Sequence, residues 1–404
     1  MDSGVWVRDY RRTLACRKCA MDGSARRLLE RWRGAGLIDA PTAARIEAWE
    51  SAQPSPAHGR LSAIAFGLGG LSLGAAVLLF VAAHWDSLGP AGRFGLVLAL
   101  VATFHVAAAA AHARLPALAT TLHAVGTAAL GAGVFLAGQI FNLGDDWPAA
   151  LLLWAAGAAA GVALLRDWPQ VVWTAALVPL WLTGEWLRAF APGQPSRESF
   201  GVLGAGLTLV ALAYLAAPAP GGGARWRAAL SYLGAATLLP AAGLLGASGF
   251  GARADAPLLA LGSPYALGWT LATGLPLATA LALRGRHGAW LLAAIPWTIA
   301  LYAAAHVAGA SAPAQAAAVL RYAVMAIGAV GLVAAGVRER RALIVNLGNL
   351  AFALTVVEFY FANLLDRLGR AAGLAGLGLT FIAGGWLLAR VRRNLIARIR
   401  SAAP

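Results

Sequence analysis

Residues 147–165 read WPAALLLWAAGAAAGVALL, a stretch without a charged side chain. The hydrocarbon core of a bilayer is about 30 Å thick, and an α-helix crosses it with about 20 apolar residues. This stretch is therefore long enough to span a membrane as one helix, with its backbone amides hydrogen-bonded internally. Similar stretches recur along the chain, and the expected spans are 61–83, 93–113, 117–141, 147–165, 170–187, 199–217, 226–246, 262–283, 288–309, 316–337, 342–361 and 370–390.

The composition of the whole chain agrees with membrane spans. Of its 404 residues, 60% are hydrophobic and only 12% are charged, and the mean hydropathy is +0.69. A soluble domain carries about 25% charged residues, so this chain has too little charge to cover a surface exposed to water. We predict an all-α, polytopic integral membrane bundle of about twelve transmembrane helices, within a range of about eleven to thirteen.

The part of the chain before the first apolar run is more polar. Ser24 suits the start of one helix, and Asp39 or Thr42 suits the start of a second. This hairpin is expected to lie against the membrane or the bundle, or to dock a protein partner through residues 24–52. A DNA-binding role is disfavoured because the hairpin lacks a polar recognition face. The predicted organisation is a disordered extension over 1–20, a helical hairpin over 21–56, the bundle over 57–392 and a basic tail over 393–404.

The distribution of charge predicts the orientation of the spans. The net charge is +15, and the positive-inside rule assigns most Lys and Arg residues to one set of loops and to both termini. Both termini are therefore expected in the cytoplasm, and the chain in the cytoplasmic (inner) membrane. The Arg-rich loops are expected to contact anionic lipids of the inner leaflet rather than nucleic acid, because their charge lies between apolar runs.

Polar side chains gather at the predicted outer ends of several spans. One interpretation is an acidic vestibule that binds a cation, or a cationic or hydroxylated ligand. The other is a set of ordinary helix caps and interfacial anchors, which need no ligand. Glu185 and Glu358 are the most deeply placed acids and the strongest candidates for functional carboxylates. The candidate outer-side residues are His84, Asp86, Gln139, Asn142, Asp145, Asp146, Glu185 and Glu358.

The sequence predicts no metal site and no cofactor. Cys16 and Cys19 form a C-x-x-C pair, but no second pair completes a zinc site. The spans also contain His105, His123 and His306, which are expected to be neutral imidazoles that either bond to neighbouring helices or line a water pocket. No nucleotide-binding motif appears, since no glycine-rich loop follows a strand.

Several short motifs carry a resemblance to a known family. They are Gly34-Ala-Gly-Leu-Ile38, the run from Gly67-Leu-Gly-Gly70 to His84-Trp85, and Gly138-Gln139-Ile-Phe-Asn142-Leu. Together they resemble the bacterial predicted-membrane-protein family called domain of unknown function 2157, over about residues 22–185. The segments 341–348 and 359–361 are also similar to the C-terminal part of such proteins, although Glu358 stands where that pattern has a basic residue. The resemblance implies an architecture, a bacterial inner-membrane location and an alternative start at Met21, but no activity.

Three functions are compatible with this sequence. The first is a transporter or permeation protein for a small solute or lipid, without an ATPase of its own. The second is a non-catalytic membrane scaffold or envelope-assembly partner. The third, an enzyme acting on lipid-linked substrates through His84 and an outer carboxylate, is less favoured than a non-enzymatic role. A polar cavity reaching the bilayer centre would favour the first, a solid bundle the second, and a pocket joining His84 to Glu185 or Glu358 the third.

Overall fold

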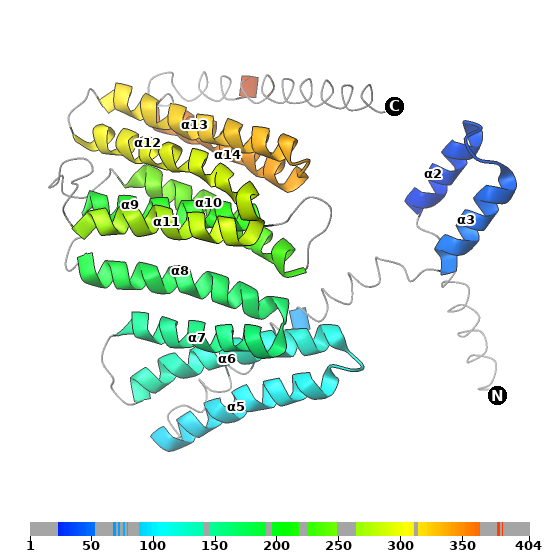
Figure 1. The fold of residues 1–404 in the computed structure, drawn as a ribbon, viewed down its shortest axis with the longest axis horizontal. Coiled ribbons are helices and arrows are strands. Elements are labelled where there is room, and N and C mark those ends of the chain that lie inside the picture. Colours follow the sequence, from blue (N-terminus) through cyan, green and yellow to red (C-terminus); the bar gives the residue numbers. More distant parts are fainter. Residues whose placement is uncertain are drawn as a thin grey trace. The chain divides into compact units, whose positions relative to one another are not determined.

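A computed structural model describes residues 23–52, 89–140, 146–190, 196–217, 225–248, 264–310 and 314–363, with isolated positions in 68–79 and 378–382. Among these residues every regular element is a helix (Figure 1). The chain forms two compact units, residues 1–129 and 130–404.

Two short helices occupy the N-terminal part of the first unit. They are α2, Gly23–Gly34, and α3, Ala40–Ala52, and they pack against each other. The backbone N–H of Thr42 donates to Asp39 Oδ1 at 3.0 Å, so Asp39 caps α3. Hydrogen bonds from the side chain and the backbone of Thr42 hold the pKa of the Asp39 carboxyl below its usual value.

Two long helices follow in the same unit: α5, Pro90–Ala111, and α6, Pro116–Ile140, which continues into the second unit. His105 Nδ1 and His123 Nδ1 lie 2.9 Å apart and share a hydrogen bond between the two helices. A Cβ at Gly126 would lie 2.8 Å from His105 Nε2, so glycine makes room for this imidazole. The hydrogen bond that we expected for intramembrane imidazoles is therefore present for this pair.

The second unit is a bundle of long helices (Figure 1). Each predicted span between residues 147 and 361 coincides with one helix, and the ends differ by a few residues. The helices are α7, Trp147–Leu165; α8, Trp168–Phe190; α9, Arg197–Leu215; α10, Arg225–Ala247; α11, Pro264–Arg284; α12, Leu291–Ala310; α13, Ala314–Arg338; and α14, Ala342–Asn363.

Eight stretches of the described residues are long and apolar enough to cross a membrane. One of them, Tyr265–His306, has 42 residues and would extend about 63 Å as a single helix, twice the hydrocarbon thickness. It is divided by the 3₁₀ helix η2, Gly285–Trp290, which begins at a glycine with φ of +59°. Apart from those isolated positions, the predicted spans 61–83 and 370–390 lie outside the residues that the structure describes. The total of about twelve spans and the location of the termini therefore stay predictions.

Helix α9 is the centre of the second unit and packs against α8, α10, α11 and α12. Its contact with α10 is close because each helix offers a glycine. A Cβ at Gly204 of α9 would lie 2.7 Å from Leu245 Cα, and one at Gly234 of α10 would meet Ala211 O and Leu215 N. Small residues at such crossings let helices approach in a membrane, where lipid removes the hydrophobic drive for association.

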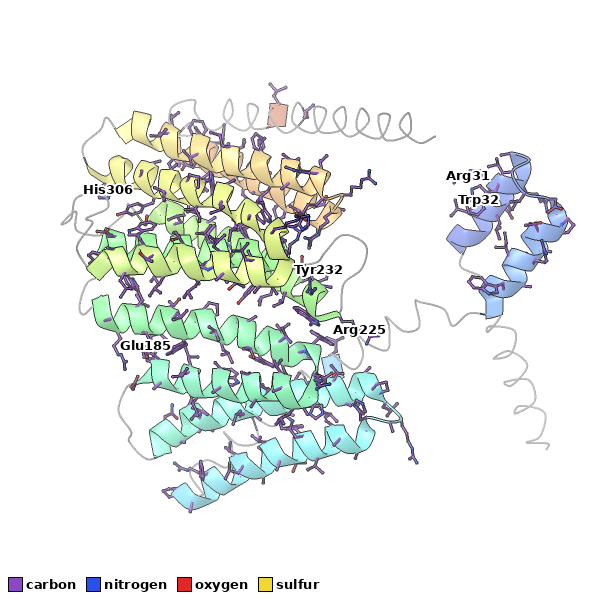
Figure 2. The ribbon with its side chains drawn as sticks, in the orientation of Figure 1. Arg31, Trp32, Glu185, Arg225, Tyr232 and His306 are labelled. Carbon is purple, nitrogen blue, oxygen red and sulfur yellow. The ribbon has the colours of Figure 1, made fainter. Side chains whose placement is uncertain are left out.

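Antiparallel packing places most acids of the second unit at one end and most arginines at the other. Glu185 and His306 lie at one end, and Arg225 and Tyr232 lie at the other (Figure 2). We call the first the acidic end, because the helix ends there carry Asp146, Glu185, Glu198 and Glu358. We call the second the arginine end, because the helix ends there carry Arg225, Arg227, Arg284, Arg286, Arg338 and Arg341.

Candidate functional site

The predicted outer-side residues fall into different environments. Gln139 is exposed at the end of α6. Asp146, Glu185 and Glu358 lie at the acidic end of the second unit. The other four, His84, Asp86, Asn142 and Asp145, lie outside the described residues, as does any pairing of His84 with an outer carboxylate.

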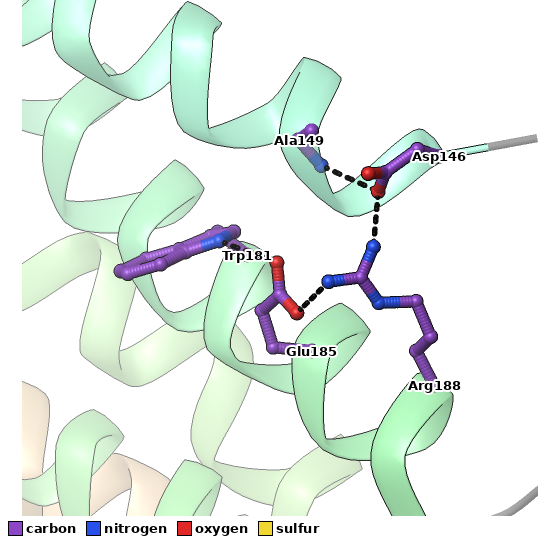
Figure 3. A network of polar contacts seen from close by, with 5 residues as sticks. All are labelled: Asp146, Ala149, Trp181, Glu185 and Arg188. Carbon is purple, nitrogen blue, oxygen red and sulfur yellow. Dashed lines mark hydrogen bonds and ion pairs between the residues drawn. The ribbon is translucent and has the colours of Figure 1, made fainter.

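Asp146 and Glu185 are brought together by Arg188 (Figure 3). The guanidinium donates to Asp146 Oδ1 and to Glu185 Oε2, each at 2.6 Å. Trp181 Nε1 donates to the other Glu185 oxygen at 3.2 Å. Asp146 also accepts from the backbone N–H of Ala149 at 3.3 Å and so caps α7. One guanidinium thus faces two carboxylates, and Arg188 offsets one of their two negative charges.

Two substitutions at Asp146 separate the cap from the ion pair. Asp146→Ala removes both, and we expect it to lower the free energy of unfolding by about 1 kcal/mol. Asp146→Asn keeps an oxygen that accepts from the backbone N–H of Ala149, so the cap remains. Only the ion pair with Arg188 is lost, and exposed ion pairs contribute little to stability. We therefore expect Asp146→Asn to lose about half as much free energy of unfolding as Asp146→Ala, or less. Thermal unfolding in detergent, followed by tryptophan fluorescence, measures both. An equal loss in the two variants would mean that the ion pair, rather than the cap, stabilises this helix start.

Glu358 belongs to a separate network on α13 and α14. It accepts from Arg321 Nη2 at 3.3 Å and from the Tyr322 hydroxyl at 3.4 Å. Arg321 is only 7% exposed, and its other terminal nitrogen donates to Gly246 O at 3.2 Å. The sequence analysis did not single out Arg321, and its burial and pairing with Glu358 appear only in the structure. In the described part of the chain, no interaction joins this network to that of Glu185.

The sequence did not single out Glu198 as a site residue, yet it is the most buried acid of the acidic end. It lies in the first turn of α9 and is 3% exposed. Trp269 Nε1 donates to its Oε1 at a long distance of 3.4 Å, and Oε2 is buried without a hydrogen-bond partner among the described residues. Burying an ionised carboxylate costs on the order of several kcal/mol, whereas a helix N-terminus contributes only about 0.3–1 kcal/mol toward the charged form. A buried ionisable group of this kind marks a functional candidate in a membrane protein.

Polar and aromatic groups around this carboxyl connect three helices. Trp186 Nε1 of α8 donates to Ser199 Oγ of α9 at 2.9 Å. Tyr265 of α11 shares a 2.9 Å hydrogen bond with Ser196, the N-cap of α9. The rings of Trp186 and Tyr265 lie 6.1 Å apart between centroids. We call Trp186, Ser196, Glu198, Ser199, Tyr265 and Trp269 the Glu198 cluster.

An apolar groove of about 120 Å³ begins at this cluster and lies between α8, α9 and α11. Its near end is formed by Trp186, Val202 and Gly268, one residue from each helix. Its far end is formed by Pro179, Val210 and Pro276, near the middle of the same helices. Val202 and Val210 are eight positions apart, which corresponds to about 12 Å along the helix. The groove thus extends from the acidic end toward the middle of the bundle, and its lining is almost entirely apolar.

The arginine end uses buried guanidinium groups to join helices. Arg341 donates to Leu215 O at 2.7 Å and to Ser231 Oγ at 2.5 Å, which links α14 to α9 and α10. Arg284 pairs with Glu339 at 2.6 Å, and Glu339 lies 3.6 Å from Arg341. Burial lowers the pKa of Arg341, and the charge of Glu339 opposes that shift. Exposed arginines at this end are Arg166, Arg225, Arg286, Arg338 and Arg340.

No group of three or more His, Cys, Asp or Glu side chains could hold a metal ion in the part of the chain that the structure describes.

A comparison with known protein families finds a match to part of the chain. Residues 30–170 match the model of a family described as predicted membrane protein (DUF2157). The resemblance to this family is confirmed over that stretch. The DUF2157 match reaches the start of α8, so the Glu198 cluster and the groove lie C-terminal to the matched residues. No curated protein and no solved structure matches the chain. The family match and the apolar helices show a helical membrane protein.

Proposed function

We propose that this membrane protein is a permeation protein for an amphiphile, meaning a lipid or a lipid-like molecule with an apolar tail. The apolar groove between α8, α9 and α11 carries this proposal. A polar solute or an ion would lose its hydration there without gaining hydrogen bonds, which is costly. An alkyl chain gains contacts with the groove wall and gives up nothing polar.

The position of the groove also supports an amphiphile. Leu271 and Leu275 line the groove on α11, yet they are 43% and 44% exposed, so the groove opens at the side of the bundle. Lipid surrounds the side of a membrane bundle, and an acyl chain can enter there without crossing water. The near end of the groove meets the polar groups of the Glu198 cluster, which suits the polar part of such a molecule.

Movement of a fluorescent phospholipid tests this function. The purified protein is reconstituted into phosphatidylcholine vesicles that contain a nitrobenzoxadiazole-labelled phospholipid, and a membrane-impermeant reductant quenches label in the outer leaflet. We expect protein to increase the fraction of label that becomes accessible. Leu271→Trp places a large ring in the groove, and we expect it to lower the rate about tenfold, equivalent to about 1.4 kcal/mol of barrier.

Leu180→Trp is the matched control for this substitution. Leu180 is 49% exposed on α8, close to the exposure of Leu271, but it does not line the groove. We expect this variant to move lipid at the wild-type rate. Equal rates for protein-containing and protein-free vesicles, or equal losses in the two tryptophan variants, would contradict the proposed function.

The surroundings that we propose for the bundle follow from its charges. The bacterial inner membrane, with both termini and the arginine end in the cytoplasm, is supported by the sorting of arginines to one end of the second unit. Arg225, Arg286, Arg338 and Arg340 are exposed there, where they can contact anionic lipid headgroups.

A scaffold role for the N-terminal hairpin is supported by one observation. Trp32, Leu37 and Trp49 are 41%, 72% and 62% exposed. Tryptophan is favoured at the boundary between membrane and water, so we propose that α2 and α3 lie on the membrane surface or dock a partner there.

A further inference from the structure

The Glu198 cluster connects the three walls of the groove at its near end. Trp186 lines the groove and bonds to Ser199, which joins α8 to α9. Trp269 follows the groove residue Gly268 and bonds to Glu198, which joins α11 to α9. Glu198 itself lies about one turn before the groove residue Val202. A change in the charge of Glu198 therefore acts where the walls of the groove are held together.

Among the side chains that the structure describes, none that faces this end of α9 neutralises Glu198. On α9 itself the neighbouring charged residue is Arg197, whose side chain lies outside the described ones. On α8 the charged groups are Glu185 and Arg188, which pair with each other. On α11 the titratable group is Tyr265, bonded to Ser196. On α12 the titratable groups are Tyr302 and His306. The ring of Tyr302 packs on Trp269, and the ring of His306 packs on Tyr302. The described end of α10 carries no titratable group there, and no described cation forms an ion pair with Glu198.

We infer that Glu198 is a proton-binding site, and that its proton controls access to the apolar groove. The control of the groove rests on the proposed function, whereas the proton site does not depend on it. With the proton on the carboxyl, the neutral side chain is compatible with a buried position, and the cluster holds the near end closed. When the proton leaves to water, a buried charge remains that needs water around it. Hydrating that charge requires the cluster to open, and the walls then separate at Trp186 and Gly268.

Infrared spectroscopy tests the proton site without any transport measurement. A protonated carboxylic acid has a carbonyl stretch distinct from the bands of an ionised carboxylate. We expect the wild-type protein, purified in a detergent without ester groups, to show this band at neutral pH. Glu198→Gln should remove it, and Glu185→Gln should leave it in place, because Glu185 is paired with Arg188. A spectrum without the band, or a band that survives in Glu198→Gln, overturns the inference.

The pH dependence of lipid movement tests the control of the groove. We expect the wild-type rate to rise with pH as Glu198 loses its proton, by roughly tenfold per pH unit at most, the limit for one titrating group. Glu198→Gln imitates the protonated side chain, so its rate should stay at the low-pH value across the range. If the rate of lipid movement depends on pH in Glu198→Gln as it does in the wild type, the inference is overturned. Absence of lipid movement at every pH, together with a band that Glu198→Gln removes, refutes the proposed function but keeps the proton site.

Trp269→Phe provides a second variant that keeps the aromatic packing. It removes the N–H that donates to Glu198 Oε1, and a hydrogen bond of this kind favours the ionised carboxylate. We expect the midpoint of the pH profile, and of the infrared titration, to move to higher pH. A midpoint that moves to lower pH contradicts the assignment of the proton to Glu198.

Discussion

Gly234→Ala is expected to lower the free energy of unfolding of the bundle by about 3 kcal/mol, the upper part of the range for overpacked sites. A Cβ at this position would meet the backbone of α9 at Ala211 O and Leu215 N, and it would lie 3.0 Å from Leu215 Cα. Backbone atoms cannot rotate aside as the end of a side chain can. The two most closely packed helices of the bundle must therefore separate, and the contacts on both sides weaken.

Gly243→Ala is the matched control on the same helix. Nothing lies within 4 Å of a Cβ at Gly243, so the substitution meets open space. Alanine has a better helix propensity than glycine by about 1 kcal/mol, so we expect no loss of stability and a small gain. Thermal unfolding in detergent, followed by the fluorescence of the tryptophans, compares the two variants. Equal stability of Gly234→Ala and Gly243→Ala would show that α9 and α10 are not in close contact.

Arg341→Ala is expected to have an effect of similar size, a loss of about 3 kcal/mol. The substitution leaves Leu215 O and Ser231 Oγ without their guanidinium donor, and it removes one of two cations near Glu339. Breaking a buried charged network is costly because the remaining polar groups stay away from water. Arg284 still pairs with Glu339 at 2.6 Å, which limits the loss.

Two neighbouring variants distinguish this explanation from a loss of charge alone. Arg340→Ala removes a positive charge from the adjacent, exposed position, and we expect a much smaller change in thermal stability. Arg341→Lys keeps the charge but not the planar fork that reaches both acceptors, so its stability should lie between that of the wild type and that of Arg341→Ala. If Arg341→Lys were as stable as the wild type, the two hydrogen bonds from Arg341 to α9 and α10 would not explain the stability.

Most of the helices were predictable from the sequence because hydrocarbon thickness sets the length of an apolar run. The stretch 147–165 and helix α7 have the same limits. Helix α8, Trp168–Phe190, extends beyond the predicted 170–187 at both ends. The prediction counted only the apolar run, whereas the helix also includes the residues that flank it. Helix α12 begins at Leu291 rather than 288, because the 3₁₀ helix η2 occupies the preceding residues.

The candidate site was less predictable, because pattern along a chain does not say which faces of two helices meet. Asp146 and Arg188 are 42 positions apart, and no local spacing connects them. Glu198 precedes the predicted span 199–217 and looks like an ordinary loop acid in the sequence. Its burial depends on Trp269, 71 positions away.

The sequence by itself determined that this chain forms apolar helices of membrane length and that most arginines lie at one set of helix ends and most acids at the other. Both properties depend on hydrophobicity and charge along the backbone, and both can be read without knowing any contact between helices. The tertiary structure alone decided which polar groups are buried, which are paired and where the apolar groove lies. Those depend on how the helices are rotated and how closely they approach, which is set by packing between residues far apart in the chain.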